Sequence, residues 1–388
     1  MTSMQTPADL LPADPGALLV GRVWSHARGG PCPVLVRDGQ VHDLCGLSPT
    51  LAGLLELDGL PGRLARVDAF PSLGELAAFL GEDEAGGPAG RLLAPCDLQT
   101  VKAAGVTFAD SMLERMIEER AKGDPAAALS IRARLEPVVG ANLRDLRAGS
   151  PEAARVKQVL QGMDLWSQYL EVGIGPDAEV FTKAPPMATV GTGASVGIHP
   201  GSEWNNPEPE VVLAVSSRGE ILGATLGNDV NLRDFEGRSA LLLGKAKDNN
   251  ASCAIGPFLR LFDGSFTLES VERLVVSLSV TGRDGFEMGG ESRMDAISRA
   301  PAELVAQTIG PNHQYPDGFM LFLGTMFAPT KDRRGAGLGF THELGDVVRI
   351  SAPELGTLCN RVERSDRAAP WEFGVLALIA NLRGRGAL

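Results

Sequence analysis

The chain has 388 residues, and its hydrophobic and charged fractions of 44% and 22% are ordinary for a globular protein. Its formal net charge of −12 at pH 7 argues against a protein that follows nucleic-acid phosphates, and an anionic substrate would need local cations or a metal at its site. No apolar run approaches the length of a membrane span, and no basic-then-apolar leader is visible at the N-terminus. We therefore expect a cytoplasmic protein with no nucleic-acid or membrane partner.

The five cysteines, Cys32, Cys45, Cys96, Cys253 and Cys359, are scattered along the chain, odd in number and without paired spacing. This pattern is typical of reduced thiols, and it favours neither a zinc site nor a framework of disulfide bonds. We expect all five to be reduced thiols.

A change of composition near Cys96 divides the chain into two predicted domains. Residues 1–97 contain short strands broken by Gly and Pro, two short helical segments and a linker candidate at 81–90. These residues are predicted to form a small α/β N-terminal domain. Residues 98–388 contain more strand than helix, with helices at the edges, so the whole chain is predicted to have an α+β fold.

Two amphipathic helices are predicted early in the second domain. The first begins near Asp110 and ends near Ala121, and the second covers about 152–170. Each carries an apolar stripe, so we expect the two helices to pack together and to cover an active site.

Two predicted strands joined by a turn at 216–219 contain the strongest candidate site. Glu208 and Glu210 are two residues apart at the start of an apolar run, so both point to one face of a strand. With four loop residues, Glu208 faces Gly227, and Asp229 lies on the same face, diagonal to Glu208. Gly227 has no side chain and is expected to leave an open space beside the carboxylates.

Three carboxylates that converge on a gap predict a hard divalent cation with oxygen ligands. The alternative is an exposed acidic strand end, which is common for any two acids at this spacing. The aligned third carboxylate and the apolar surroundings favour the metal site. A change of one residue in the turn would move Asp229 to the other face and remove the prediction.

Several short motifs follow one another in a fixed order after residue 97. They are Phe181-x-Lys183-x-Pro185, Glu208-x-Glu210, Gly227-Asn228-Asp229-Val230, Arg233-Asp234, Lys247, Ile255-Gly256-Pro257, Gly324-Thr325 and Gly345-Asp346-Val347-Val348. In this order and spacing, the stretch of about 97–365 resembles the fumarylacetoacetate hydrolase superfamily. The resemblance implies a mixed β-roll catalytic domain, a homodimer or homotetramer, and Mg²⁺ or Mn²⁺ held by carboxylates that match Glu208, Glu210 and Asp229.

One segment departs from the hydrolytic members of this superfamily, which carry N-Y-x-x-H-x-x-E after the first strand of the domain. The corresponding residues 107–114 read T-F-A-D-S-M-L-E, so Glu114 is retained but Ser111 replaces the histidine. Serine is no base near neutral pH without a partner of its own, which weakens a hydrolytic interpretation. The chain more closely resembles the branch that dehydrates 2-keto-3-deoxy sugar acids, in its W-N-x-P-E-P-E stretch at 204–210, its L-G-T-M-F-A-P stretch at 323–329 and its additional N-terminal domain.

The resemblance implies that a 2-keto acid chelates the ion through its carboxylate and keto oxygens, while the metal stabilises the enolate left when a C3 proton departs. Three residues are candidates for moving protons. Lys247 is preferred over Lys245 because its distance to Gly256 matches the lysine-to-Gly-Pro spacing of the superfamily, and burial would have to lower its pKa. Glu114 and His342 are the other candidates, and each has a structural role as its alternative.

Five residues are predicted to bind the substrate: Lys183, Arg233, Thr325, Ser111 and His199. Lys183 and Arg233 offer positive charge, and Thr325 ends a buried strand at a Gly turn, where its hydroxyl can donate to a carboxylate. The alternatives are a surface position for Lys183, a pairing of Arg233 with Asp234 and a structural role for His199.

The leading hypothesis is a metal-dependent dehydratase that converts a 2-keto-3-deoxy pentonate to 2,5-dioxopentanoate in pentose catabolism. The second hypothesis is a hydrolase that cleaves a carbon–carbon bond in an acylpyruvate or diketo acid. The third is a non-catalytic ligand-binding protein on the same fold. In both enzyme hypotheses the partner is a small 2-keto acid.

Overall fold

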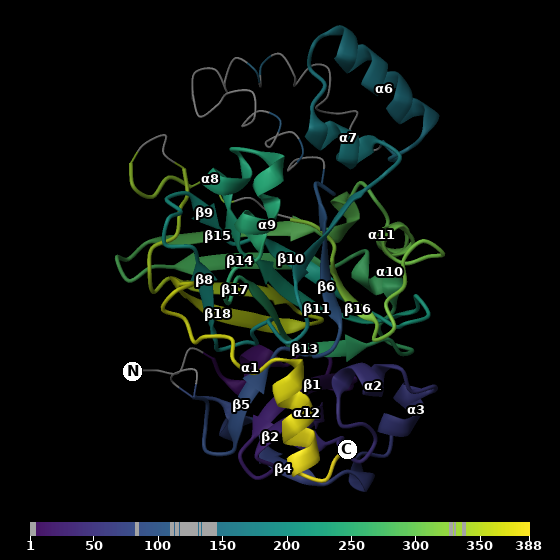
Figure 1. Ribbon diagram of the computed structural model, residues 1–388, viewed down its shortest axis with the longest axis vertical. Helices are drawn as coiled ribbons and strands as arrows, with labels where there is room; N and C mark the ends of the chain where they lie inside the picture. Colours follow the sequence, from purple (N-terminus) through teal and green to yellow (C-terminus); the bar gives the residue numbers. More distant parts are fainter. Residues whose placement is uncertain are drawn as a thin grey trace.

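The structure is a computed structural model that describes residues 5–81, 85–108, 112, 116, 131, 133, 146–325, 329, 331–335 and 339–388. These residues form two main β-sheets, a short two-stranded sheet and helices at the edges (Figure 1). The predicted α+β class is therefore confirmed. Within the described residues, no helix combines the length and the apolar character that crossing a membrane requires.

The larger sheet contains eleven strands of the described chain. They are β1 (Leu19–Ser25), β2 (Gly30–Arg37), β3 (Gln40–Asp43), β4 (Ser72–Glu75), β5 (Gly90–Leu93), β6 (Thr100–Gly105), β7 (Glu179–Ala184), β10 (Pro209–Val215), β11 (Ile221–Asp229), β13 (Cys253–Leu261) and β16 (Phe319–Phe322). They lie in the order β4-β3-β2-β1-β13-β11-β10-β16-β6-β7, and β5 pairs separately with β1. The pairing of β1 with β13 joins the N-terminal strands to the strands that carry the motifs.

The second sheet has five described strands in the order β15-β14-β17-β18-β8. They are β8 (Ser195–Ile198), β14 (Val275–Thr281), β15 (Glu287–Arg293), β17 (Val347–Ala352) and β18 (Gly356–Arg364). Two short strands, β9 (Asn205–Asn206) and β12 (Asn231–Leu232), pair with each other and extend the carboxylate hairpin beyond β10 and β11.

The helices are mostly short and lie at the edges of the sheets (Figure 1). The α-helices are α1 (Pro7–Leu10), α2 (Leu51–Leu55), α3 (Leu60–Leu64), α6 (Pro151–Gly162), α7 (Gln168–Ile174), α8 (Arg233–Glu236), α9 (Leu243–Lys247), α10 (Leu268–Val271), α11 (Pro301–Thr308) and α12 (Val375–Gly384). The 3-10 helices are η1 (Val67–Ala69), η2 (Leu76–Phe79), η3 (Ala240–Leu242) and η4 (Met294–Ala296).

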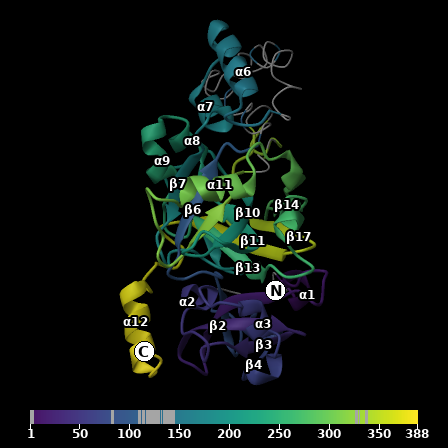
Figure 2. The same cartoon turned by 90° about the vertical axis from the view of Figure 1, so that its right-hand side faces the viewer.

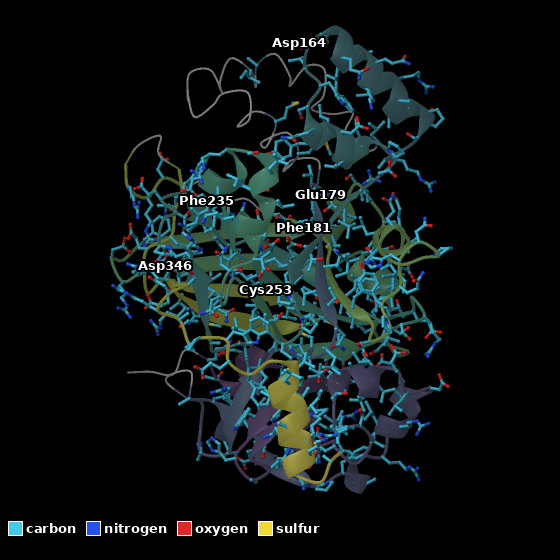
Figure 3. The ribbon with its side chains drawn as sticks, viewed as in Figure 1. Asp164, Glu179, Phe181, Phe235, Cys253 and Asp346 are labelled. Carbon is cyan, nitrogen blue, oxygen red and sulfur yellow. The ribbon has the colours of Figure 1, made fainter. Side chains whose placement is uncertain are left out.

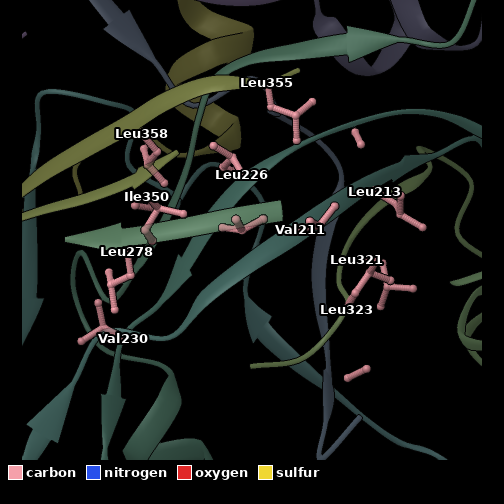
Figure 4. Close-up of a cluster of buried hydrophobic side chains, with 14 of the residues drawn as sticks. Val211, Leu213, Leu226, Val230, Leu278, Leu321, Leu323, Ile350, Leu355 and Leu358 are labelled. Atoms are coloured by element: carbon pink, nitrogen blue, oxygen red, sulfur yellow. The ribbon is translucent and has the colours of Figure 1, made fainter. Parts of the chain in front are cut away.

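The main core lies between the two sheets (Figure 4). Val211, Leu213 and Leu226 of the β10–β11 hairpin belong to one buried cluster with Leu278 and Ile350 of the second sheet. All seven residues of β10 are buried. The strand therefore has apolar side chains on both faces, which explains its continuous apolar run.

The carboxylates project from the opposite face of the larger sheet. Val212 and Phe322 lie in a second buried cluster, together with leucines of α2. Because side chains alternate along a strand, Glu208 and Glu210 share the face of Val212. The core between the sheets and the candidate site therefore occupy opposite faces of one strand.

The register of the carboxylate hairpin differs from the predicted one by two residues. Glu210 pairs with Gly227, and a bulge between Ala214 and Val215 adjusts the pairing near the turn. The backbone N–H of Asp229 donates to the carbonyl of Glu208 at 3.0 Å, so these two residues lie opposite each other and not diagonally. Because a shift of two residues preserves the face, the prediction that Asp229 joins both glutamates is confirmed.

The open space predicted at Gly227 is absent from the described structure. A Cβ atom at this position would lie 2.2 Å from Phe322 Cε1 and 2.6 Å from Val212 Cγ2. The glycine is needed because the Phe322 ring of the neighbouring β16 packs directly against its backbone. This correction could not be foreseen from the hairpin alone, since Phe322 is far away in the sequence.

The second predicted helix, 152–170, is two helices in the structure. It breaks after α6 because Ser167 caps α7 by accepting a hydrogen bond from the backbone N–H of Leu170 at 3.4 Å. Most of the first predicted helix lies outside the described residues, but its Met112 and Met116 are buried in one cluster with Leu160 of α6. The predicted packing is confirmed for these residues, and the covering role stays a prediction.

The C-terminal helix α12 lies beside the N-terminal strands in both views (Figures 1 and 2). Asn381 Nδ2 donates to the carbonyl of Gly29 at 2.9 Å, and Arg385 Nη2 donates to the carbonyl of Pro31 at 2.9 Å. The end of the chain thus returns to the predicted N-terminal domain. The domain boundary at residue 97 stays a prediction.

We expect Gly227→Ala to destabilise the protein by about 1–3 kcal/mol, because the added methyl group would force Phe322 and Val212 to move. Urea unfolding followed by circular dichroism measures this loss. Gly264→Ala is the matched control, since nothing lies within 4 Å of the position that its methyl group would take. Equal stability of the two variants would contradict the close packing at Gly227.

Candidate active site

The β10–β11 hairpin brings together the three predicted metal ligands, Glu208, Glu210 and Asp229. Each offers one carboxylate oxygen, and the three oxygens lie within 4.8 Å of one another. The residues are 2%, 1% and 2% exposed, which excludes an exposed acidic strand end. Buried carboxylates at this separation must be balanced by cations, because their mutual repulsion is weakly screened.

Glu210 shows this repulsion most clearly. Burial, followed by the negative charges of Asp229 and Glu208, raises the pKa of Glu210 well above its ordinary value. The backbone N–H of Gly324 donates to Oε2 of Glu210 at 2.6 Å, and the hydroxyl of Thr325 donates to Oε1 at 3.4 Å. These two donors orient the carboxylate but add no full positive charge.

Two lysine ammonium groups lie against the carboxylates. Lys183 Nζ is 2.8 Å from Asp229 Oδ1, and Lys247 Nζ is 3.2 Å from Asp229 Oδ2. Lys247 Nζ also contacts Oε2 of Glu208. Asp229 is therefore held between two lysines, while Glu210 accepts hydrogen bonds from the 324–325 turn.

The contacts of Lys183 are those of a residue that positions other groups. Its side chain is fully buried, and Nζ also donates to the backbone carbonyls of Lys247 and Val230 and to Ser252 Oγ. These acceptors fix both Asp229 and the end of α9. The surface position considered for Lys183 is wrong, and its role in substrate binding stays a prediction.

Lys247 is placed at the carboxylates by the short helix α9. It is 3% exposed and is the last residue of that helix. Lys245, two residues earlier, is exposed, and its ammonium lies 5.4 Å from the ring centroid of Phe235. The structure therefore agrees with the preference for Lys247 over Lys245 as the lysine nearest the site.

Two asparagines that the sequence did not single out as site residues support Glu208. Asn231 Nδ2 donates to Oε1 of Glu208 at 3.0 Å and to Oε2 of Glu236 at 2.7 Å. Asn228 Oδ1 accepts the backbone N–H of Glu208 at 3.2 Å. The available signal was their position on either side of Asp229 in an otherwise apolar segment.

The site fits a hard divalent cation. Carboxylate oxygens are the ligands that Mg²⁺ and Mn²⁺ prefer, and a cation would relieve the repulsion that keeps the pKa of Glu210 high. Asn231 Oδ1 and Asn228 Nδ2 are buried and lack a hydrogen-bond partner among the described residues. Since buried polar atoms are nearly always bonded, water or a polar ligand is expected beside the carboxylates.

The predicted residue His342 belongs to a separate buried network. Its Nδ1 lies 3.1 Å from Asp346 Oδ2, and Arg333 pairs with both oxygens of Asp346 at 2.5 and 2.8 Å. Burial lowers the pKa of His342 despite the neighbouring carboxylate, so the ring is neutral near pH 7. Its backbone N–H donates to Asn205 Oδ1 at 3.3 Å, which links this network to β9.

The predicted substrate residues Arg233 and His199 lie on the β9 and α8 side of the hairpin. Arg233 stacks over the ring of Trp204, with 5.3 Å from its Cζ to the ring centroid. Asp234, its alternative partner, accepts hydrogen bonds from Ser202 Oγ at 2.7 Å and the backbone N–H of Glu203 at 2.8 Å. His199 Nδ1 accepts the backbone N–H of Gly201 at 3.0 Å.

Figure 3 labels some of the residues that neighbour these groups. Cys253, which pairs with Asp229 across β11 and β13, lies near the middle of the view, whereas Phe235 and Asp346 lie toward its left side. The carboxylates, Lys183, Lys247 and Thr325 lie together in the structure. Ser111 and Glu114 lie outside the described residues, and their predicted roles stay predictions.

Residues 167–363 match the family model described as fumarylacetoacetate (FAA) hydrolase C-terminal. The chain is 33% identical over 188 residues to 2-dehydro-3-deoxy-D-arabinonate dehydratase of Saccharolobus solfataricus. The match covers 48% of this chain and 59% of that protein. The chain is 35% identical over 198 residues to a probable 2-keto-3-deoxyxylonate dehydratase of Haloferax volcanii, or 50% of this chain and 63% of that one. Each match covers less than two thirds of the relative.

Two solved structures share the fold. 2-Keto-3-deoxy-D-arabinonate dehydratase complexed with magnesium and 2,5-dioxopentanoate has a TM-score of 0.59 at 21% identity, covering 89% of this chain and 99% of that one. Fumarylacetoacetate hydrolase from Exiguobacterium antarcticum has a TM-score of 0.55 at 16% identity, and the match covers 90% of this chain and 100% of that one. At these identities the likeness shows the fold alone.

We expect Lys183→Met to destabilise the metal-free protein by about 3–5 kcal/mol, because it leaves Asp229 buried beside one fewer cation. Urea unfolding in the presence of a chelator measures the change. Combining it with Asp229→Asn should cost less than the sum of the single substitutions, since the pair is then removed together. Lys245→Met is the exposed control, and a Lys183→Met variant as stable as this control would refute the role of Lys183.

We expect His342 to make stability depend on pH. Its folded-state pKa is below the ordinary value of 6.5, so the unfolded chain binds more protons below that pH, and stability falls as the pH drops. The slope from this group is at most about 1.4 kcal/mol per pH unit. Unfolding between about pH 7 and pH 5 should show a smaller slope in His342→Gln than in the wild type.

The exposed residue His313 provides the control for this measurement, and His313→Gln should keep the wild-type slope. An unchanged slope in His342→Gln would show that the ring does not titrate as its burial requires.

Proposed function

Since the chain belongs to the fumarylacetoacetate hydrolase family, we propose that it is a metal-dependent dehydratase of 2-keto-3-deoxy sugar acids. The observation that carries this proposal is the buried cluster of Glu208, Glu210 and Asp229 on the motifs of the family. The names of relatives at 33% and 35% identity support water elimination as the reaction.

The proposed cofactor is Mg²⁺, with Mn²⁺ as a second candidate, held by the three carboxylates. When bound, the ion supplies a Lewis acid that polarises the keto group of the substrate. The solved dehydratase complexed with magnesium and 2,5-dioxopentanoate supports this pairing of cation and product class. The chain itself contributes the cage, oriented by Asn231, Asn228 and the 324–325 turn.

The proposed substrate is a five-carbon acid that loses a proton from C3 and the hydroxyl group from C4 as water. Loss of a C5 proton and tautomerisation then give 2,5-dioxopentanoate. Lys247 is the proposed proton-transfer residue, because its Nζ reaches the carboxylate cluster from a flexible side chain. Its ammonium form would also neutralise the carboxylate of an incoming acid in this negatively charged chain. Glu114 and His342 remain the alternatives for proton transfer.

The proposal includes substrate contacts through four residues, Arg233, Thr325, Ser111 and His199. It also includes assembly as a homodimer or homotetramer and a role in pentose catabolism. Arg233 is the residue among them whose charge and 8% exposure suit a carboxylate at the site edge.

The purified protein with Mg²⁺ should convert a 2-keto-3-deoxy pentonate to 2,5-dioxopentanoate, measured as the semialdehyde. Glu210→Ala should reduce kcat/KM at least about 100-fold, because it removes charge stabilisation at the reacting group. Glu220→Ala is the matched control on the same hairpin, since that carboxylate is 57% exposed and pairs with Arg218. Its kcat/KM should equal the wild-type value.

Release of pyruvate from a diketo acid, with no semialdehyde from the pentonate, would replace the dehydratase proposal with the hydrolase. Calorimetry tests the metal site separately. Unchanged Mg²⁺ affinity in Glu208→Ala, Glu210→Ala and Asp229→Ala would show that these residues are not the ligands.

A further inference from the structure

Cys32 and Cys45 lie next to each other in the N-terminal part of the larger sheet. The β2–β3 pairing ends at Val34 and Asp43, and Cys32 and Cys45 each lie two residues beyond that pair. The backbone N–H of Leu44 donates to the carbonyl of Pro33 at 3.0 Å, which keeps the two segments together beyond the strand pair. Cys45 lies in the turn that follows.

The two sulfur atoms are close enough to be joined. Cys32 Sγ, Cys45 Sγ and a carboxylate oxygen of Asp43 lie within 4.8 Å of one another. A disulfide requires the two sulfurs to approach to about 2.05 Å, so they have less than 3 Å to close. All five cysteines are free thiols in the structure, as expected, but Cys32 and Cys45 lie together, which sequence spacing alone did not reveal.

The neighbouring donors make Cys32 the more acidic of the two thiols. Arg385 is the residue after helix α12, and its Nη1 donates to Cys32 Sγ at 3.5 Å. The hydrogen bond from Cys45, assisted by Arg385, lowers the pKa of Cys32, and the same hydrogen bond together with burial raises the pKa of Cys45. Arg28 pairs with Asp43 at 2.5 Å, so the nearby carboxylate is already balanced.

These cations disfavour the other chemistry open to two sulfurs and a carboxylate, which is a soft metal ion. Arg385 binds one sulfur and Arg28 binds the carboxylate, so two of the three donors already have a positive partner. Cys32 is fully buried whereas Cys45 is partly exposed, which gives one sulfur access to a reagent and protects the other.

We propose that Cys32 and Cys45 form a reversible disulfide by exchange with a low-molecular-weight disulfide, and that this bond loosens the attachment of helix α12. This site is separate from the carboxylate cluster and does not depend on the proposed function.

The exchange takes place in two steps. Cys45 attacks one sulfur of the external disulfide, and the proton of Cys45 passes to the thiolate that is expelled. Cys32 then attacks Cys45 Sγ, and the second thiolate released takes the proton of Cys32. The cysteines lose two electrons, and the external disulfide gains them as it becomes two thiols.

Three side-chain contacts attach helix α12 to the β2 region. Arg385, the residue after the helix, donates to Cys32 Sγ and to the carbonyl of Pro31. Asn381 of the helix donates to the carbonyl of Gly29. The helix lies beside β2 in Figure 1. A disulfide makes Cys32 Sγ a weaker acceptor for Arg385, but it leaves the two carbonyl contacts. Oxidation should therefore loosen the end of the helix without releasing the whole segment.

The test incubates the full-length protein with glutathione disulfide, blocks the remaining thiols and digests it with trypsin. Cleavage after Arg28, Arg37 and Arg63 separates the cysteines into fragments 29–37 and 38–63. We expect these fragments to be joined, and the count of free thiols to fall from five to three. Dithiothreitol should restore all five.

Cys45→Ser is the test variant, because Cys45 is partly exposed and its replacement is tolerated more readily than that of buried Cys32. It should form no link between the two fragments. Cys359→Ser is the matched control, since Cys359 is a buried residue of β18, and this variant should form the link as the wild type does. Hydrogen exchange of residues 375–384 should become at least about twofold faster in the oxidised protein.

Retention of all five thiols would overturn the disulfide. So would glutathione adducts without a link between fragments 29–37 and 38–63. One zinc ion per chain in the purified protein, lost in Cys45→Ser, would show a metal site in its place. Equal hydrogen exchange of residues 375–384 in both redox states would overturn the effect on α12.

Discussion

The candidate site depends on the balance between three buried carboxylates and two buried ammonium groups. Each charge costs several kcal/mol to remove from water, and the loss is recovered only where opposite charges meet in good geometry. Asp229 is held by Lys183 and Lys247, and Glu208 is held by Lys247, which leaves a net excess of negative charge at the cluster. Burial and this excess of negative charge together raise the pKa of Glu210, and a bound cation would offset both.

Different parts of the fold supply the members of this cluster. The hairpin provides the carboxylates, β7 provides Lys183 and the end of α9 provides Lys247. The apolar packing of β10 on both faces fixes the direction of Glu208 and Glu210, since a slip by one residue would turn them into the core. Lys183 connects these parts, because it bonds both to Asp229 and to the backbone end of α9.

The period-two pattern of the strands was enough to predict the shared face of the three acids. This prediction stayed correct although the predicted register was wrong by two residues, because an even shift keeps every side chain on its face. Tertiary neighbours were not predictable in this way. The ring of Phe322 against Gly227 joins residues distant in sequence, and the amide of Asn231 on Glu208 joins two strands. The pairing of Asp346 with His342 and Arg333 is closer in sequence, but it lies in a segment without strand periodicity. The closeness of Cys32 and Cys45 follows from the pairing of β2 with β3, which the spacing of the cysteines in the sequence does not reveal.

The central claim is that the carboxylate cluster binds a divalent cation. Anomalous diffraction from a crystal soaked in Mn²⁺ tests it directly, because the signal locates the ion without assumptions about activity. The account predicts one strong peak within bonding distance, about 2.0–2.3 Å, of oxygens from Glu208, Glu210 and Asp229. Lys247 Nζ should move away from at least one of the oxygens that it contacts here. A peak elsewhere, or an unchanged Lys247 beside an empty cluster, would contradict the account.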